Sequence, residues 1–269
     1  MNRAKHVKRT AAAAAALFSL WPVLRPGVTS GAQLSTAPDA RYAGLQWRFV
    51  RVKYHYDAAA LRAQQQDVYG EPWAIDSPAA EQNLSRRVKT ATAIQVEDPI
   101  LLTLDDPQLF QYPWIYVVEP GALALNDRDA ANLREFLLRG GTAMFDDFHG
   151  PYEWDNLERQ MKRVFPDRRI TEVTPDHPVF NCFYKIDAYP QVPGIGSFLA
   201  GRTWEKGGLV AHLRTILGDT GRPMVFINWN TDMGDGWEWS NVVEYPGYLK
   251  FTAMAYRMAI NEVVYSLTH

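Results

Sequence analysis

The sequence has few of the residues that would hold the chain together covalently or form a nucleotide site. Cys182 is the one cysteine among 269 residues, which excludes an intrachain disulfide and any metal site with several cysteines. Aromatic residues flank Cys182 and predict a buried, unreactive thiol rather than a nucleophile. The glycines of Pro193–Gly196 do not open a helix, so no phosphate loop is predicted. Stability must therefore come from a core, which 47% hydrophobic residues can supply.

The N-terminus lacks an apolar run of comfortable membrane-spanning length. Basic residues at 3–9 precede the apolar stretch Ala11–Leu24, which contains Pro22, and small residues follow at Ser30–Ala32. This pattern predicts a signal peptide over residues 1–32, a flexible lead-in over 33–45, and a periplasmic or secreted protein with no stable membrane span after cleavage. An uncleaved N-terminal anchor is the alternative.

An excess of basic residues is also missing. Five of the 28 Lys and Arg and none of the 30 Asp and Glu precede residue 33, so residues 33–269 carry a net charge of −7. Nucleic acids and anionic membrane surfaces need a basic patch, so both are excluded as partners. A small molecule, a glycan or an envelope protein remains as a possible class of partner.

Residues 46–269 alternate between strand-like and helix-like patterns. Trp114–Val118 is a continuous apolar run typical of a buried parallel strand, and Asn126 is a helix cap followed by an apolar stripe that ends at Gly140. Thr142–Phe145 is the next apolar strand. The alternation predicts a single α/β domain with a mostly parallel sheet covered on both faces, and an irregular insertion at about 175–208.

Two carboxylates and an imidazole follow the strand over 142–145, where ligands bind in open α/β sheets. They are Asp146, Asp147 and His149; Asp176 and His177 form a second pair in an Asp-His-Pro segment. Such side chains predict a catalytic site at Asp146, Asp147, His149 and His177, either as acid–base groups or around a divalent metal such as Zn, Mn or Ni. In the alternative interpretation, Asp146 caps the next helix and His177 satisfies backbone carbonyls.

A second acidic segment, Asp232–Glu238, follows another predicted strand. Its spacing resembles that of calcium loops and adds Asp232 and Asp235 to the candidate metal ligands, which also include Asp147, His149, Asp176 and His177. A tight turn at its two glycines is the alternative. Nearby aromatic residues suggest rings that stack on a sugar, namely Tyr152, Trp154 and Trp237, although aromatics are more often part of the core.

Several stretches together resemble one bacterial family. They are Asn83–Thr92, Leu109–Tyr116, Leu133–Gly150, Val164–Pro178, Asn228–Trp237 and Ala259–Tyr265. As a set they resemble family 4159 of the domains of unknown function, over nearly all of the chain after residue 32.

This resemblance implies a class I glutamine-amidotransferase-like fold, a flavodoxin-like three-layer sandwich, and no particular activity. True amidotransferases have a cysteine elbow after a buried strand, and this chain has Asp146-Asp147 there, so thioester chemistry is excluded at that position. The chain is more distantly similar to the trehalose-utilisation relatives of the same fold. Some larger family members carry the domain beside membrane segments.

Three classes of function follow from these features. The first is a metal-assisted hydrolase or lyase acting on a small polar or sugar-like substrate, with Asp147 as base. The second is a noncatalytic module that binds a ligand or carbohydrate, and the third is a structural component of a cell-envelope assembly. The fold does not decide among them.

Overall fold

A computed structural model describes residues 40–57 and 70–269 of the chain. The predicted signal peptide and most of the lead-in lie outside these residues. Among the helices of the described residues, none is both long and apolar enough to cross a bilayer.

A seven-stranded sheet forms the centre of the domain, in the order β2-β1-β3-β4-β7-β6-β5. The strands are β1 (Gln46–Lys53), β2 (Gln95–Thr103), β3 (Trp114–Val118), β4 (Thr142–Phe148), β5 (Ile170–Glu172), β6 (His212–Ile216) and β7 (Val225–Trp229). Strands β2, β1, β3, β4 and β7 run parallel, while β6 and β5 are antiparallel to their neighbours. The predicted α/β class, with a mostly parallel sheet in a flavodoxin-like sandwich, is confirmed.

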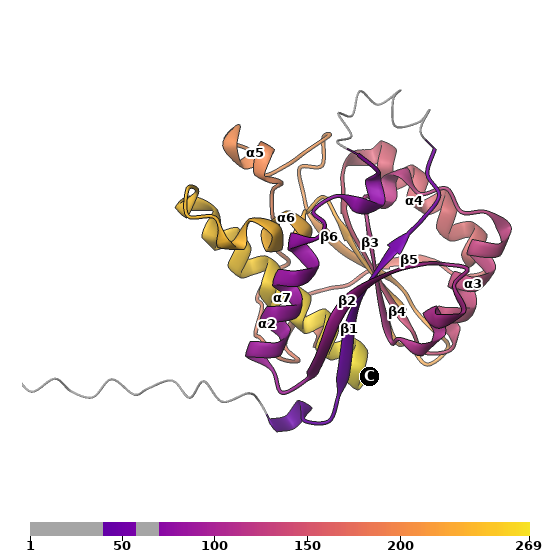
Figure 1. Ribbon diagram of the computed structural model, residues 1–269. Helices are drawn as coiled ribbons and strands as arrows, with labels where there is room; N and C mark the ends of the chain where they lie inside the picture. Colours follow the sequence, from indigo (N-terminus) through magenta and orange to yellow (C-terminus); the bar gives the residue numbers. More distant parts are fainter. Residues whose placement is uncertain (1–39, 58–69) are drawn as a thin grey trace, which may run out of the picture. The chain divides into compact units, whose positions relative to one another are not determined.

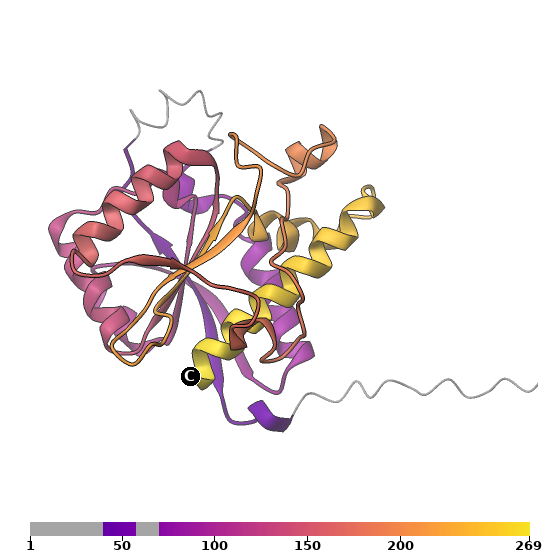
Figure 2. The same cartoon turned by 180° about the vertical axis from the view of Figure 1, so that it is seen from behind.

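Helices cover both faces of this sheet (Figure 1). The helices are α2 (Ala79–Ala91), α3 (Asp127–Leu138), α4 (Gly150–Val164), α5 (Ile195–Leu199), α6 (Met233–Glu238) and α7 (Leu249–Thr268). Helices α2, α6 and α7 lie on one face and α3 and α4 on the other, which the reverse view in Figure 2 shows again. Short α5 is the only α-helix that the structure describes within the predicted irregular insertion, and it begins directly after Gly194, where the sequence predicted no helix.

The strands alternate their side chains between two hydrophobic clusters. On β1, Phe49 is buried with the α2 and α7 side chains, whereas Val50 and Val52 are buried with those of α3 and α4. Every residue of β3 and β4 is buried, as is typical of parallel strands covered on both faces. Burial on both faces fixes the register, and so it fixes which residues emerge at the strand ends.

The predicted start and stop of α3 are confirmed. The Asn126 side chain accepts a hydrogen bond from the Asp129 backbone N–H at 2.8 Å, which satisfies a free donor at the helix start. Gly140 ends the helix region with φ 105°, a backbone conformation that favours glycine. The chain then enters β4 directly, so β4 ends at the same sheet edge as β3.

Two segments near this edge differ from the prediction. Strand β4 continues to Phe148, and its pairing with β7 shifts between Phe145 and Phe148, where Asp147 has φ 58°. The segment after β7 forms the short helix α6 rather than a loop or a tight turn. Gly236 explains the helix, since a Cβ there would lie 2.4 Å from the Ala255 Cβ of α7.

Candidate functional site

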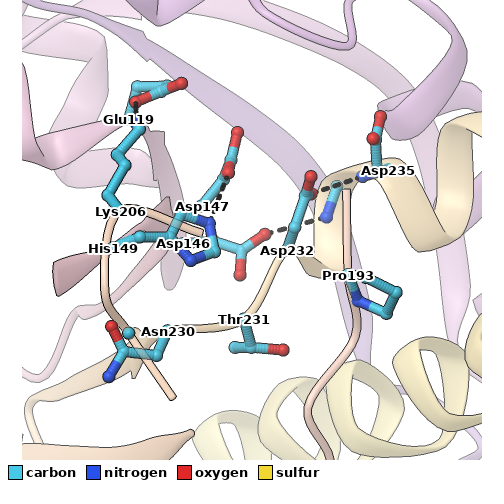
Figure 3. Close-up of polar contacts among 12 residues, drawn as sticks. Glu119, Asp146, Asp147, His149, Pro193, Lys206, Asn230, Thr231, Asp232 and Asp235 are labelled. Carbon is cyan, nitrogen blue, oxygen red and sulfur yellow. Dashed lines mark hydrogen bonds and ion pairs between the residues drawn. The ribbon is translucent and has the colours of Figure 1, made fainter. Parts of the chain in front are cut away.

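A cavity of about 360 Å³ opens at the carboxyl ends of β3, β4 and β7. Six acidic residues line it and define what we call the carboxylate pocket: Asp76, Glu119, Asp147, Glu205, Asp232 and Asp235. Arg202 is the one cationic residue among the described residues that line it. Figure 3 shows the carboxylates of Glu119, Asp147, Asp232 and Asp235 on the same side of the site. The predicted sheet edge is therefore strongly acidic.

Asp146 lies beneath the pocket and holds helix α6 in place. Its carboxylate accepts hydrogen bonds from the backbone N–H groups of Met233 at 3.2 Å and Gly234 at 2.9 Å, and from the Tyr116 hydroxyl at 2.9 Å. Burial raises the pKa of Asp146 to about 6, although these hydrogen bonds oppose the rise. Asp146 therefore anchors the first residues of α6, whose N-cap is Asp232, and does not cap α4 as the alternative interpretation held.

Asp147 faces the pocket and is supported from behind by His149. The His149 Nε2 atom lies 3.2 Å from Asp147 Oδ1, and the imidazole is only 1% exposed. Burial lowers the pKa of His149, which favours a neutral ring that donates its Nε2 proton to Asp147. The other nitrogen, Nδ1, is buried with no hydrogen-bond partner. Because His149 is not among the residues that line the pocket, we assign it a positioning role.

Burial raises the pKa of Asp147 well above its ordinary value, and the nearby charge of Glu205 raises it further. Burial likewise raises the pKa of Asp232, with Asp147 and Asp235 adding to the effect. The pKa of Asp235 rises to about 7 for the same first reason. The carboxylates thus oppose one another's ionisation, so the pocket favours either bound protons or a bound cation.

Helix α6 fixes the two aspartates that end the pocket on the β7 side. Asp232 is the N-cap, and its Oδ1 accepts a hydrogen bond from the Asp235 N–H at 2.7 Å. Asp235 in turn accepts hydrogen bonds from the Ile195 N–H at 2.5 Å and from Trp239 Nε1 at 3.0 Å. The Trp239 contact comes from the residue that follows α6, and the Ile195 contact ties the first residue of α5 to the pocket.

Lys206 closes the opposite side of the pocket. Its ammonium lies 2.7 Å from Glu153 Oε1 and 3.8 Å from Glu119 Oε2. Burial lowers the pKa of Lys206, but the charges of Glu119, Glu153 and Asp147 outweigh this effect and keep the amine protonated. This single ammonium is shared by several carboxylates, so it leaves most of the pocket's negative charge uncompensated.

Backbone strain is concentrated around the same site. All five non-glycine residues with positive φ among the described residues are in or beside the pocket. They are Asp76, Glu119, Asp147, Lys206 and Asn230. Each such conformation costs on the order of 1–3 kcal/mol and persists where the surrounding structure imposes it, which is common at functional sites.

Three pocket carboxylates have the arrangement of a cation site. One oxygen each from Asp76, Asp147 and Asp232 lie within 4.8 Å of one another. Asp76 Oδ2 is buried and makes no hydrogen bond. The ligands that converge here are oxygens, which suit Mg²⁺, Ca²⁺ or Mn²⁺ rather than the Zn or Ni expected from imidazole ligands. The residues present therefore fit a hard divalent cation.

A glycine leaves space beside these carboxylates. A Cβ on Gly194 would lie 2.6 Å from Glu205 Oε1, 3.0 Å from Asp232 Oδ2 and 3.3 Å from Asp235 Oδ2. Any larger residue at position 194 would therefore enter the space that these oxygens surround.

The structure does not bring Asp176 and His177 to this edge. His177 packs against Tyr265 in the last turns of α7, with 5.2 Å between ring centroids, whereas α6 contacts α7 at Phe251 and Ala255. From Phe251 to Tyr265 the helix extends about 21 Å at 1.5 Å per residue. His177 Nδ1 accepts a hydrogen bond from the Val179 N–H and so caps the short 3-10 turn Pro178–Phe180. The structure therefore places His177 outside the carboxylate pocket, where it acts as a cap.

Asp176 shares this location. It is exposed, and its carboxylate accepts a hydrogen bond from the Thr174 hydroxyl. As a neighbour of His177 in sequence, it likewise lies outside the carboxylate pocket and contributes no ligand there.

The aromatic residues do not form a free stacking platform. Trp237 is fully buried against Phe49 and Tyr116, so its ring offers no exposed face to a sugar. Trp154 packs against Trp229 with 4.8 Å between ring centroids, and the Arg214 guanidinium lies over both rings. Tyr152 is 56% exposed and stays a candidate for ligand contact.

Sequence reasoning missed four residues of the site: Asp76, Glu119, Glu205 and Lys206. Glu119 directly follows the buried strand Trp114–Val118, so the rule that selected Asp146 and Asp147 would also have selected it. Asp76, Glu205 and Lys206 lie in connecting segments that carry no such signal.

Comparison with known proteins identifies the family of this chain. No curated protein matches the chain. One family model matches residues 48–267, from β1 to the last residues of α7, and so includes every residue of the carboxylate pocket. The chain therefore belongs to the family described as Domain of unknown function (DUF4159).

Proposed function

We propose that this chain is a divalent-cation-dependent hydrolase that acts on a small polar substrate in the carboxylate pocket. The observation that carries the proposal is the convergence of Asp76, Asp147 and Asp232, with oxygens within 4.8 Å of one another in a cavity open to solvent. The buried, unpartnered Asp76 Oδ2 supports it, because a buried polar atom without a partner is costly unless a ligand satisfies it.

The role of each residue follows from its position. A bound divalent cation would supply Lewis acidity and lower the pKa of a coordinated water. Asp76, Asp147 and Asp232 would hold it, and His149 would orient Asp147 through its Nε2–H. This leaves Asp147 as a ligand rather than the base expected from the sequence.

Glu205 is the best-placed group to accept a proton. It lines the pocket, lies beside Gly194 and belongs to neither the triad nor the ion pairs of Lys206. A carboxylate within reach of a bound water can act as general base. Glu205→Gln is therefore expected to keep cation binding and lose hydrolysis.

The pocket's composition favours hydrolysis over sugar binding. It is lined by charged residues rather than by open aromatic faces, since Trp237 is in the core and Trp154 is covered by Arg214. A noncatalytic glycan site would need at least one free ring face beside the pocket. Export, as the basic and then apolar N-terminus suggests, would place this activity in the cell envelope.

Thermal unfolding of the chelator-treated chain tests the proposal. Mg²⁺, Mn²⁺ or Ca²⁺ at 100 times its Kd should raise Tm by about 5–10 °C, since binding at that ratio adds about 2.7 kcal/mol to a domain of this size. The cation that gives the largest shift is then used with ester, phosphoester and glycoside substrates, with and without chelator. No shift with any of these cations would overturn the proposal.

A further inference from the structure

Asp76 belongs to two groups of carboxylates rather than one. Besides the triad with Asp147 and Asp232, one oxygen each from Asp76, Asp235 and Glu238 lie within 4.8 Å of one another. The two groups share Asp76 and no other residue. Two adjacent groups of three oxygens that meet at one carboxylate are the arrangement expected of a pair of cations.

The Asp76 side chain is free to serve both groups. Its Oδ2 atom is buried and has no hydrogen-bond partner, so nothing in the described part of the chain satisfies it. Its position depends on Gly234, because a Cβ there would lie 2.1 Å from Asp76 Oδ2. A cluster of acidic residues alone would not indicate a bound ligand. The buried Asp76 oxygen without a partner supplies that evidence.

Helix α6 presents the second group. Asp235 and Glu238 are three residues apart, so their side chains lie on the same face of the helix. Asp235 is held by the Ile195 N–H and Trp239 Nε1, and each of its oxygens keeps a further lone pair. Glu238 is half-buried at the end of the helix, with its backbone carbonyl bonded to Asn83.

We infer that the carboxylate pocket holds two divalent cations, one between Asp76, Asp147 and Asp232 and the other between Asp76, Asp235 and Glu238, with Asp76 as the bridging ligand. The inference rests on the proposed function, because the first cation is the one proposed there. It adds a second ion and assigns Glu238, which is outside the first group, as a ligand.

Mn²⁺ stoichiometry and electron paramagnetic resonance test this inference. After equilibrium dialysis of the chelator-treated chain against excess Mn²⁺, elemental analysis should give two Mn²⁺ per chain. Their resonance should show exchange coupling rather than the six-line signal of an isolated ion. Glu238→Gln should bind one Mn²⁺ with the six-line signal, while Glu244→Gln, at an exposed residue of the next segment, should keep two coupled ions.

The outcomes separate the two proposals. One Mn²⁺ per wild-type chain, unchanged in Glu238→Gln, would overturn the second cation and leave the first intact. Two coupled ions that persist in Glu238→Gln would overturn the assignment of Glu238. No bound Mn²⁺ would overturn both proposals. Circular dichroism of each variant shows that it is folded before binding is compared.

Discussion

At the residue scale, the space beside Gly194 is where the proposed cation would approach the pocket carboxylates. A methyl group at this position would lie within 3.3 Å of three carboxylate oxygens, from Glu205, Asp232 and Asp235. We expect Gly194→Ala to weaken divalent-cation binding at least tenfold, because the side chains must move out of their ligand positions. Isothermal titration calorimetry with Mn²⁺ measures the change.

Gly196 provides the matched control for this substitution. It also lines the pocket, but a Cβ there would meet nothing within 4 Å. Gly196→Ala should therefore bind Mn²⁺ as the wild type does. Equal affinities for the two variants would contradict the position assigned to the cation.

Asp147 should show a trade-off between stability and function. Burial and the neighbouring carboxylates raise its pKa, so the ionised form destabilises the cation-free fold. Asp147→Asn should raise the Tm of the chelator-treated chain by a few degrees and remove the further rise that cations give. Differential scanning calorimetry measures both effects, with Asp155→Asn, at an exposed residue of α4, as control.

A lower Tm for cation-free Asp147→Asn would indicate that the Asp147 carboxylate stabilises the fold. It would contradict the expectation that repulsion from neighbouring carboxylates makes this group destabilising. An unchanged response to cations would remove Asp147 from the ligand set.

Part of the site could be predicted from single residues. The carboxyl ends of parallel strands meet at one edge of the sheet, independent of the loops that follow them. Four predicted site residues follow such strands and do lie together, namely Asp147, His149, Asp232 and Asp235. The same reasoning failed for His177. Strand β5 runs parallel to β7, because both are antiparallel to β6, but β5 is the last strand of the sheet and residues 173–176 separate its end from His177. Asp76 could not be predicted, since it enters the pocket from a connection before α2.

At the scale of elements, the close packing of α6 on α7 positions two of the six acidic residues of the carboxylate pocket, Asp232 and Asp235. A Cβ on Gly236 would lie 2.4 Å from the Ala255 Cβ and 3.2 Å from Val192 Cγ1. Gly236→Ala should lower the free energy of unfolding by about 1–3 kcal/mol, as overpacking does, despite the better helix propensity of alanine. Urea unfolding measures the loss.

A second substitution isolates the cause of this loss. Ala255→Gly removes the methyl group that Gly236→Ala would strike, so the double variant should be more stable than the sum of the two single changes predicts. Strict additivity would show that the two helices are not in the contact described.

The elements themselves were predictable where one signal dominated. Continuous apolar runs gave β3 and most of β4, and an Asn cap with a Gly stop gave α3. Helix α6 was not predictable from local sequence, because two glycines in six residues favour a turn. The helix forms because Gly236 allows close contact with α7 and Gly234 allows close contact with Asp76, tertiary effects that outweigh local propensity.

At the scale of the whole molecule, the surplus of buried carboxyl groups makes stability depend on pH. Burial raises the pKa of Asp146 to about 6 and that of Asp235 to about 7, and raises those of Asp76, Asp147, Asp232 and Glu119 well above ordinary values. A carboxyl with a raised pKa stabilises the fold while protonated, and this contribution is lost as the pH rises through the folded-state pKa.

The cation-free chain should therefore be more stable at pH 6 than at pH 8. Each carboxyl that titrates in this range contributes up to about 1.4 kcal/mol per pH unit. The lowered pKa of His149 acts in the opposite direction, but it is one group against several. Urea unfolding at the two pH values measures the difference, and saturating Mn²⁺ should remove most of it. Lower stability at pH 6 would contradict the expected balance.

Calorimetric titration of Mn²⁺ into the chelator-treated chain at pH 7.5 shows whether these carboxylates form a divalent-cation site. We expect saturable binding with a Kd in the micromolar range or tighter, lost in Asp147→Asn and retained in Asp155→Asn. Absence of saturable binding by the folded wild-type chain, or binding that Asp147→Asn leaves unchanged, would contradict this expectation.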